Sequence, residues 1–151
     1  LVFSGYKSPK REVTIKVKSN WQFLKLNVEQ DVSGHSKGLT ADLGAEFPLL
    51  MLENGFMLNA SAKVHWQSSD FANYIYGIAG TQIDNSVGRT VYSVGSVTNY
   101  SVGLSGFYKL NKAWNLIASV NHTLLDDAVT DSPLIDNDKE TGSFVGAIYS
   151  F

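Results

Sequence analysis

The sequence contains no cysteine, which excludes a disulfide framework, cysteine-ligated zinc and thiol catalysis. Charged residues make up only 17% of the 151 residues, below the roughly 25% of an average soluble domain. The net charge of −2 means that the chain has no excess of positive charge to attract phosphates, so we expect no nucleic-acid partner. No stretch approaches the roughly 18 consecutive apolar residues of a transmembrane helix. Membrane strands are not excluded, because their two faces alternate and average to a mean hydropathy near zero, as here.

Apolar and polar residues alternate along several segments, with the period of a β-strand. The clearest segment is 56–67, whose apolar face carries Phe56, Leu58, Ala60, Ala62, Val64 and Trp66. A helix would place Lys63 and His65 among these apolar residues, so the pattern favours a strand. The same alternation recurs at 12–18, 24–31, 39–49, 99–110, 114–124 and 145–151. We therefore predict seven strands and no helix, with 1–5 considered as the tail of an eighth strand.

The connections between these segments alternate in length. The short ones are 19–21, 50–55 and 111–113, and the longer ones are 33–38, 68–97 and 125–140. Tight turns at one end and long loops at the other are typical of an outer-membrane β-barrel, with the turns in the periplasm. Several segments also reach the roughly 9–11 residues of a membrane strand, and aromatic residues gather near their ends. A soluble β-sandwich would show the same alternation, but loop asymmetry and strand length favour the barrel.

The predicted fold class is thus all-β, an antiparallel transmembrane β-barrel with seven or eight strands in this chain. We treat 1–151 as a single outer-membrane barrel domain. The chain begins at Leu1 without a methionine or a basic leader. Because unpaired strand edges are not tolerated in lipid, we expect either closure at eight strands or additional N-terminal strands in a larger, even-stranded barrel.

Four segments resemble a known family. Residues 34–45 (GHSKGLTADLGA) resemble the G-H-x-G-L-x-x-D-L-G-A segment of the MltA-interacting protein (MipA/OmpV) family, with an extra Ser-Lys pair after the histidine. Residues 74–78 (YIYGI) are similar to its Y-[YF]-G-V segment, and residues 132–136 (SPLID) to its S-P-[IL]-V-x segment. Residues 146–151 (GAIYSF) are similar to its G-L-x-Y-x-F end. The segments occur in family order.

This resemblance implies a non-enzymatic protein of the Gram-negative outer membrane without cofactors. The implied role is a scaffold that bridges a lytic transglycosylase and a peptidoglycan synthase, coupling wall cleavage to wall synthesis. Other members are described as porin-like channels or surface adhesins, and these remain the alternatives. The implied surroundings are outer-membrane lipid, lipopolysaccharide and the barrel assembly machinery.

The C-terminal segment carries a candidate assembly signal. Val145, Ala147, Tyr149 and Phe151 fall on one face of the last predicted strand. This pattern is similar to the signal that the assembly machinery reads, and that machinery can add a strand to its own open edge. The alternative is a lipid-facing strand with an aromatic anchor, and both interpretations can hold together.

The longest predicted loop contains four aromatic residues, Phe71, Tyr74, Tyr76 and Tyr92. Exposed aromatic side chains in a long loop can form a recognition surface. Alternatively, the loop folds back and caps the barrel. The sequence does not separate these two interpretations.

The polar face of the predicted strands carries mixed charges. These are Glu12, Lys16, Lys18, Lys25, Glu29, Asp31, Asp42, Glu46, Lys63, His65 and Lys109. We favour a barrel interior held by paired charges over a strongly selective pore. A symmetric turn at 50–55 predicts a cross-strand pair of Asp42 with Lys63. His65 with Asp42 or Glu46 could form an acid–base pair, but no nucleophile stands in a recognisable relation to them and no histidine spacing indicates a metal.

Overall fold

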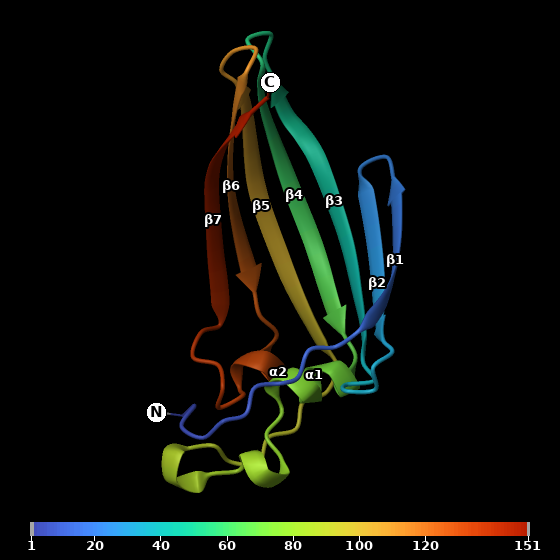
Figure 1. The fold of residues 1–151 in the computed structure, drawn as a ribbon, viewed down its shortest axis with the longest axis vertical. Coiled ribbons are helices and arrows are strands. Elements are labelled where there is room, and N and C mark those ends of the chain that lie inside the picture. The colour runs from blue at the N-terminus through green and yellow to red at the C-terminus, as the bar shows by residue number, and fades with distance from the viewer. Residues whose placement is uncertain (1, 151) are drawn as a thin grey trace.

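The computed structural model describes residues 2–150, and its architecture is one antiparallel sheet (Figure 1). Its seven strands are β1 (Thr14–Trp21), β2 (Leu24–Asp31), β3 (Leu39–Met51), β4 (Phe56–Gln67), β5 (Val97–Lys109), β6 (Trp114–Leu124) and β7 (Lys139–Tyr149). Each strand pairs with its neighbours in the chain, in the order β1 to β7. The all-β antiparallel prediction is confirmed. In the described part of the chain the sheet stays open, with β1 and β7 as its edges.

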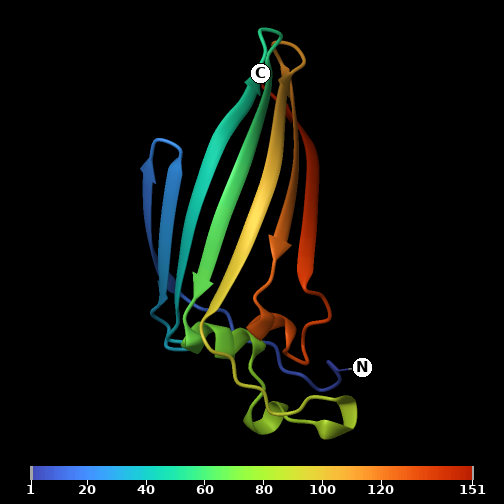
Figure 2. The ribbon, with the colours of Figure 1, turned by 180° about the vertical axis from the view of Figure 1, so that it is seen from behind.

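The connections separate by length as the sequence predicts. The turns that join β1 to β2, β3 to β4 and β5 to β6 lie together at one end of the sheet (Figures 1 and 2). The longer connections lie at the other end, where the segment 2–13 also runs before β1 begins. Val2–Gly5, considered as the tail of an eighth strand, forms a turn instead.

The long connections contain helices, so the prediction of no helix is wrong. They are α1 (Ser69–Tyr76), the 3₁₀ turns η1 (Gly80–Gln82) and η2 (Asn85–Val87), and α2 (Asp127–Thr130). The Ser68 hydroxyl caps α1 by accepting from the Phe71 N–H at 3.5 Å. The same oxygen accepts from the Leu39 N–H at 2.9 Å, which fixes the start of α1 to the start of β3. No helix in the described residues is long and apolar enough to cross a membrane.

Buried apolar side chains gather beside the sheet ends rather than along the strands. A small core at the loop end is formed by Ala72 of α1, Val94 of the α1–β5 connection, Val97 at the start of β5, and Val129 of α2. We call this assembly of residues 68–96 and 125–138 the cap. Along the strands, by contrast, large apolar side chains are exposed on one face, and Val145 is 82% exposed. A face of this kind is suited to contact with lipid rather than water.

Candidate functional site

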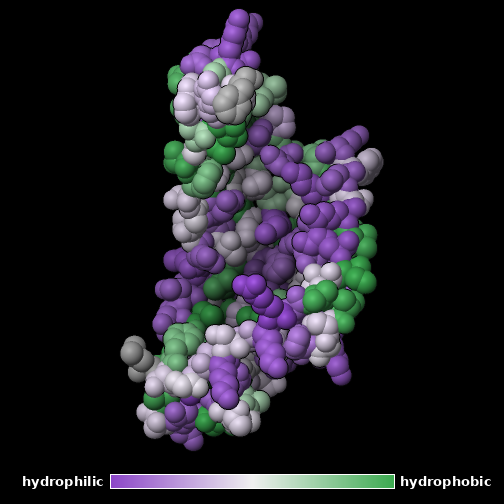
Figure 3. All heavy atoms as spheres, viewed as in Figure 1, coloured by the Kyte–Doolittle hydropathy of each residue, from purple (hydrophilic) through white to green (hydrophobic). Residues whose placement is uncertain are grey.

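The polar face of the sheet forms a hollow of about 420 Å³. Figure 3 shows hydrophilic residues over this side of the sheet. The polar side chains that line it come from β2 to β6 and are Lys25, Asn27, Asp42, Glu46, Ser61, Lys63, Ser101, Asn121 and Thr123. They occupy alternate positions on each strand, so the period-two pattern places them on one face. Gly103 leaves room for this lining, because an added Cβ there would lie 2.9 Å from the Ser61 hydroxyl.

Charges on this face are paired across neighbouring strands. Lys16 forms an ion pair with Glu29 between β1 and β2. Lys25 and Glu46 pair at 2.5 Å between β2 and β3. All four side chains are partly exposed, so each pair contributes little to stability. Their arrangement fits the paired-charge interpretation of the interior.

The predicted pair of Asp42 with Lys63 is wrong. Asp42 lies opposite His65, and its Oδ1 is 2.6 Å from the His65 Nδ1, whereas Lys63 lies opposite Gly44. The β3–β4 turn is shorter than the predicted turn at 50–55, and its centre lies later in the sequence. The reason is that the Leu52 N–H donates to the Phe56 carbonyl, so the strands still pair at this point. Its Gly55 adopts φ +83°, a left-handed conformation that glycine allows. An irregularity between Pro48 and Leu50 then shifts the register again.

His65 connects two polar partners. Its Nδ1 contacts Asp42, and its Nε2 lies 2.9 Å from the Gln67 side-chain nitrogen. Of the two carboxylates considered for an acid–base pair, Asp42 is therefore the one in contact. Gln67 is only 5% exposed, and its Oε1 has no hydrogen-bond partner among residues 2–150. No group of three or more metal-binding side chains occurs within the described residues.

The four aromatic residues of the long loop pack within or beside the cap. The Tyr74 hydroxyl donates to the Lys10 carbonyl at 2.9 Å, and the Tyr92 hydroxyl donates to the Ala128 carbonyl at 2.8 Å. Tyr76 packs against the buried core, and Phe71 lies against Gly38. All four are half-buried. Their placement is the one expected if the loop folds back, and a role in recognition stays a prediction.

Burial also changes the pKa of one side chain of the cap. It raises the pKa of the Tyr92 hydroxyl above its usual value, and the nearby carboxylates of Asp131 and Asp126 act in the same direction. Asp126 caps α2 by accepting from the Ala128 N–H at 2.9 Å. Its other oxygen accepts from the Thr98 N–H at 2.8 Å, so this acidic residue fastens α2 to β5.

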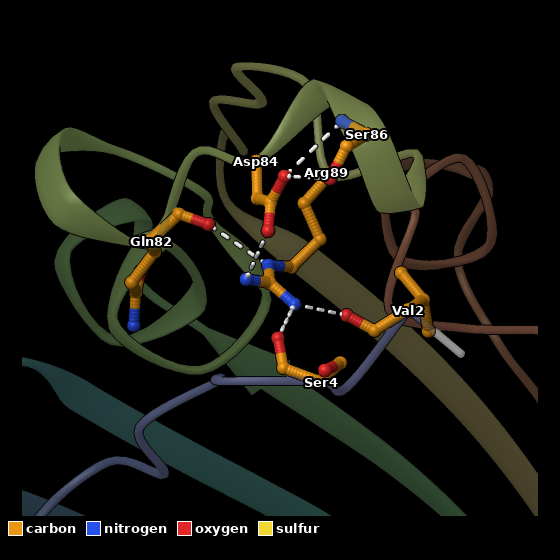
Figure 4. Close-up of polar contacts among 6 residues, drawn as sticks. All are labelled: Val2, Ser4, Gln82, Asp84, Ser86 and Arg89. Atoms are coloured by element: carbon orange, nitrogen blue, oxygen red, sulfur yellow. Dashed lines mark hydrogen bonds and ion pairs between the residues drawn. The ribbon is translucent and has the colours of Figure 1, made fainter.

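Arg89 joins the cap to the N-terminal segment (Figure 4). Its side chain is 3% exposed. The guanidinium donates to the carbonyls of Val2 and Ser4, the latter at 2.6 Å, and to the Gln82 carbonyl at 2.9 Å. It also lies 3.6 Å from the Asp84 carboxylate. These contacts tie the start of the described chain to a loop more than 80 residues away.

Sequence reasoning missed this contact, although a signal was present. Asp84 and Arg89 are the only charged residues between Asp70 and Lys109. The Ser86 hydroxyl and N–H donate to the Asp84 carboxylate at 2.6 and 3.1 Å. These hydrogen bonds lower the pKa of Asp84 below its usual value, and the Arg89 charge acts in the same direction. Their effect is larger than the increase in pKa that desolvation causes.

The C-terminal residues with the assembly-signal pattern lie on β7, an edge of the sheet. Val145, Ala147 and Tyr149 are exposed on one face. The Tyr149 ring packs against Trp114 of β6 with ring centroids 5.0 Å apart. Phe151 lies outside the described residues. Recognition of this face by the assembly machinery stays a prediction.

Comparisons with known proteins agree on one family. The family model described as MltA-interacting protein MipA matches residues 3–151. Outer membrane protein Omp26La of Vibrio anguillarum is 29% identical over 76 residues, which cover 50% of this chain and 29% of that protein. Outer membrane protein OmpV of Vibrio cholerae is 28% identical over 76 residues, with the same coverage. The MltA-interacting protein of Escherichia coli K12 is 23% identical over 133 residues, which cover 88% of this chain and 52% of that protein.

The chain therefore spans about half of the length of these curated relatives, or less. No solved structure matches it.

Proposed function

We propose that this chain, which belongs to the MltA-interacting protein MipA family, serves as a scaffold for peptidoglycan-remodelling enzymes. It is an outer-membrane protein, as its family and relatives are. The observation that carries the proposal is the family match over residues 3–151, together with a relative named for its interaction with MltA. The proposed partners are a lytic transglycosylase and a peptidoglycan synthase, and the proposed role is binding without catalysis.

The turn end of the sheet is the surface we propose for this binding. If the turns face the periplasm, only this end can meet enzymes that act on the cell wall. The β3–β4 turn extends further than the β1–β2 turn (Figure 1). The end of β3 and the start of this turn expose large apolar side chains in succession, among them Leu50, Met51 and Leu52, and Met51 is 67% exposed. An exposed apolar tip of this kind is suited to a protein contact.

Co-purification from the native envelope tests the scaffold proposal. The full-length protein is solubilised in mild detergent, and its partners are identified by mass spectrometry. We expect a lytic transglycosylase at near-stoichiometric yield, and its loss in a variant carrying Met51→Asp and Leu52→Asp. The matched control is Val91→Asp, since Val91 is 69% exposed in the cap at the opposite end. Recovery of only assembly factors and lipopolysaccharide would contradict the scaffold role.

The polar hollow favours a second candidate, a porin-like channel. Its lining of charged and hydroxyl side chains would suit water and small solutes if further strands complete a barrel. Planar-bilayer recording of the full-length protein tests this proposal, and discrete conductance steps are the expected result. Because the lining carries charges of both signs, we expect only weak ion selectivity. Adhesion through the long loops is the other alternative, and deletion of cap residues would abolish surface binding in that case.

The assembly signal also stays a proposal. Exposure of Val145, Ala147 and Tyr149 on an edge strand supports it, because an edge can pair with a strand of another protein. Outer-membrane lipid and lipopolysaccharide are the proposed surroundings of the exposed apolar face.

A further inference from the structure

A second cavity lies at the loop end, between the N-terminal segment and the cap. Its volume is about 520 Å³, within the range of a few hundred Å³ that small-molecule sites occupy. Most of its lining is aromatic or aliphatic. These residues include Phe3 and Tyr6 of the N-terminal segment, Ile75 and Tyr76 of α1, and Leu134 and Ile135 of the β6–β7 connection. The cavity is separate from the polar hollow of the sheet, with which it shares no lining residue.

The charges at this cavity are all of one sign. Lys10 and Arg11 line it, and no acidic residue of the described range does. Neither cationic side chain makes an ion pair or a hydrogen bond with another residue in 2–150. The hydroxyls of Tyr6 and Tyr76 likewise have no hydrogen-bond partner within the described chain. Unpaired cations and free hydroxyl donors beside apolar walls are the groups that would bind a carboxylate attached to an apolar body.

The walls of the cavity are fastened in place. Arg89 holds the carbonyls of Val2 and Ser4, which flank Phe3 (Figure 4). The Tyr74 hydroxyl holds the Lys10 carbonyl from α1. The N-terminal wall is therefore tied to the cap at both ends, and a ligand would not have to order this segment on binding.

We propose that this cavity binds a small carboxylate with an aromatic or alkyl body. The carboxylate lies beside Lys10 and Arg11, and the apolar body packs between Phe3, Tyr6 and α1. A cation of the same shape would be repelled, and a neutral alcohol would lose the charge contacts. This binding does not depend on the scaffold role, since the cavity lies at the end of the sheet opposite the turns.

The test uses the full-length protein in nanodiscs of phosphatidylcholine, with 3-phenylpropionate as the probe. Binding is measured by calorimetry and by saturation-transfer NMR, alongside 3-phenylpropanol and 3-phenylpropylamine. We expect the acid to bind more tightly than the alcohol and the amine to bind least. The double variant Lys10→Gln/Arg11→Gln should weaken binding of 3-phenylpropionate by roughly tenfold, as expected for two charge contacts at a partly exposed site. It should leave binding of 3-phenylpropanol unchanged.

Two further variants complete the test. Lys7→Gln is the matched control, because Lys7 lies on the same segment but lines a neighbouring hollow and not this cavity. It should leave binding of the acid unchanged. Ile135→Glu places a carboxylate in the cavity and should abolish binding of the acid while sparing the amine. The proposal is overturned if the acid does not bind, if the amine binds as tightly as the acid, or if Lys7→Gln weakens the acid as much as the double variant.

Discussion

Replacing Arg89 with methionine tests the contact that ties the N-terminal segment to the cap. Methionine keeps much of the volume of the side chain but removes all of its donors. The change leaves the carbonyls of Val2, Ser4 and Gln82 without the guanidinium. We expect the cap to open locally more often, and not the strands to separate, because the side-chain hydrogen bonds and the ion pair of Arg89 go to residues outside the strands.

The magnitude follows from the three hydrogen bonds. A hydrogen bond to a charged group contributes about 1.5–3 kcal/mol. Ser4 is exposed, so water replaces part of what is lost there. The Asp84 carboxylate is 39% exposed and 3.6 Å away, so we assign its ion pair nothing. If the bond to Ser4 is left out and the bonds to Val2 and Gln82 are each taken at the lower end of that range, the free energy of local opening should fall by about 3 kcal/mol, which is on the order of a 100-fold rise in the opening equilibrium.

Hydrogen exchange with mass spectrometry measures this opening. The reporting amides include those of Asp84 and Arg89, which bond to each other's carbonyls at 2.9 and 3.0 Å. Peptides covering 2–6 and 78–92 should exchange faster in Arg89→Met, while peptides from β4 and β5 should not change. Arg11→Met is the control, because Arg11 is exposed and should have no effect. Unchanged exchange of 78–92 in Arg89→Met would refute the assignment of Arg89 as the fastening residue.

Three other perturbations have defined outcomes. Gly38→Ala should detach the start of α1 from the start of β3, because an added Cβ would lie 2.7 Å from the Phe71 Cα and N. Proteolysis of α1 should then become faster. An unchanged rate of proteolysis would contradict this contact. Acid should loosen the 78–92 loop. The folded pKa of Asp84 lies below its ordinary value of 3.8, so its contribution is complete above that pH and is lost as the pH falls through the folded pKa. Hydrogen exchange corrected for its intrinsic pH dependence should show this loss, and Asp84→Asn should remove it. Tyr149→Ala should slow insertion into vesicles that contain the assembly machinery, whereas Phe144→Ala, on the opposite face of β7, should not; equal slowing would contradict the signal.

Strand positions follow directly from the alternation. The segment 56–67 forms β4 and the segment 114–124 forms β6, with the predicted ends. β1 and β7 differ from the prediction. β1 runs from Thr14 to Trp21, so the turn predicted at 19–21 is wrong and lies at 22–23 instead, and β7 begins at Lys139 and not near Val145. Residues 139–143 carry polar or small side chains on both faces, so they show no alternation. They become a strand through pairing with β6, in which Lys139 lies opposite Leu124.

The register and the cap could not be predicted in the same way. The partner of Asp42 depends on the conformation of Gly55 and on an irregularity near Pro48. The alternation of apolar and polar residues predicts neither of these features. α1 has only eight residues, about two turns, so its helical period is too short to detect. Arg89 functions through main-chain carbonyls of a distant segment, and a carbonyl carries no sequence signal.

Direct binding to a lytic transglycosylase tests whether this protein serves as a scaffold. The full-length protein, held in nanodiscs, is titrated with the purified transglycosylase of the same organism, and binding is followed by interferometry. We expect saturable binding that Met51→Asp with Leu52→Asp abolishes and Val91→Asp leaves intact. Absence of binding would contradict the scaffold function. Binding that only Val91→Asp disrupts would contradict its assignment to the turn end.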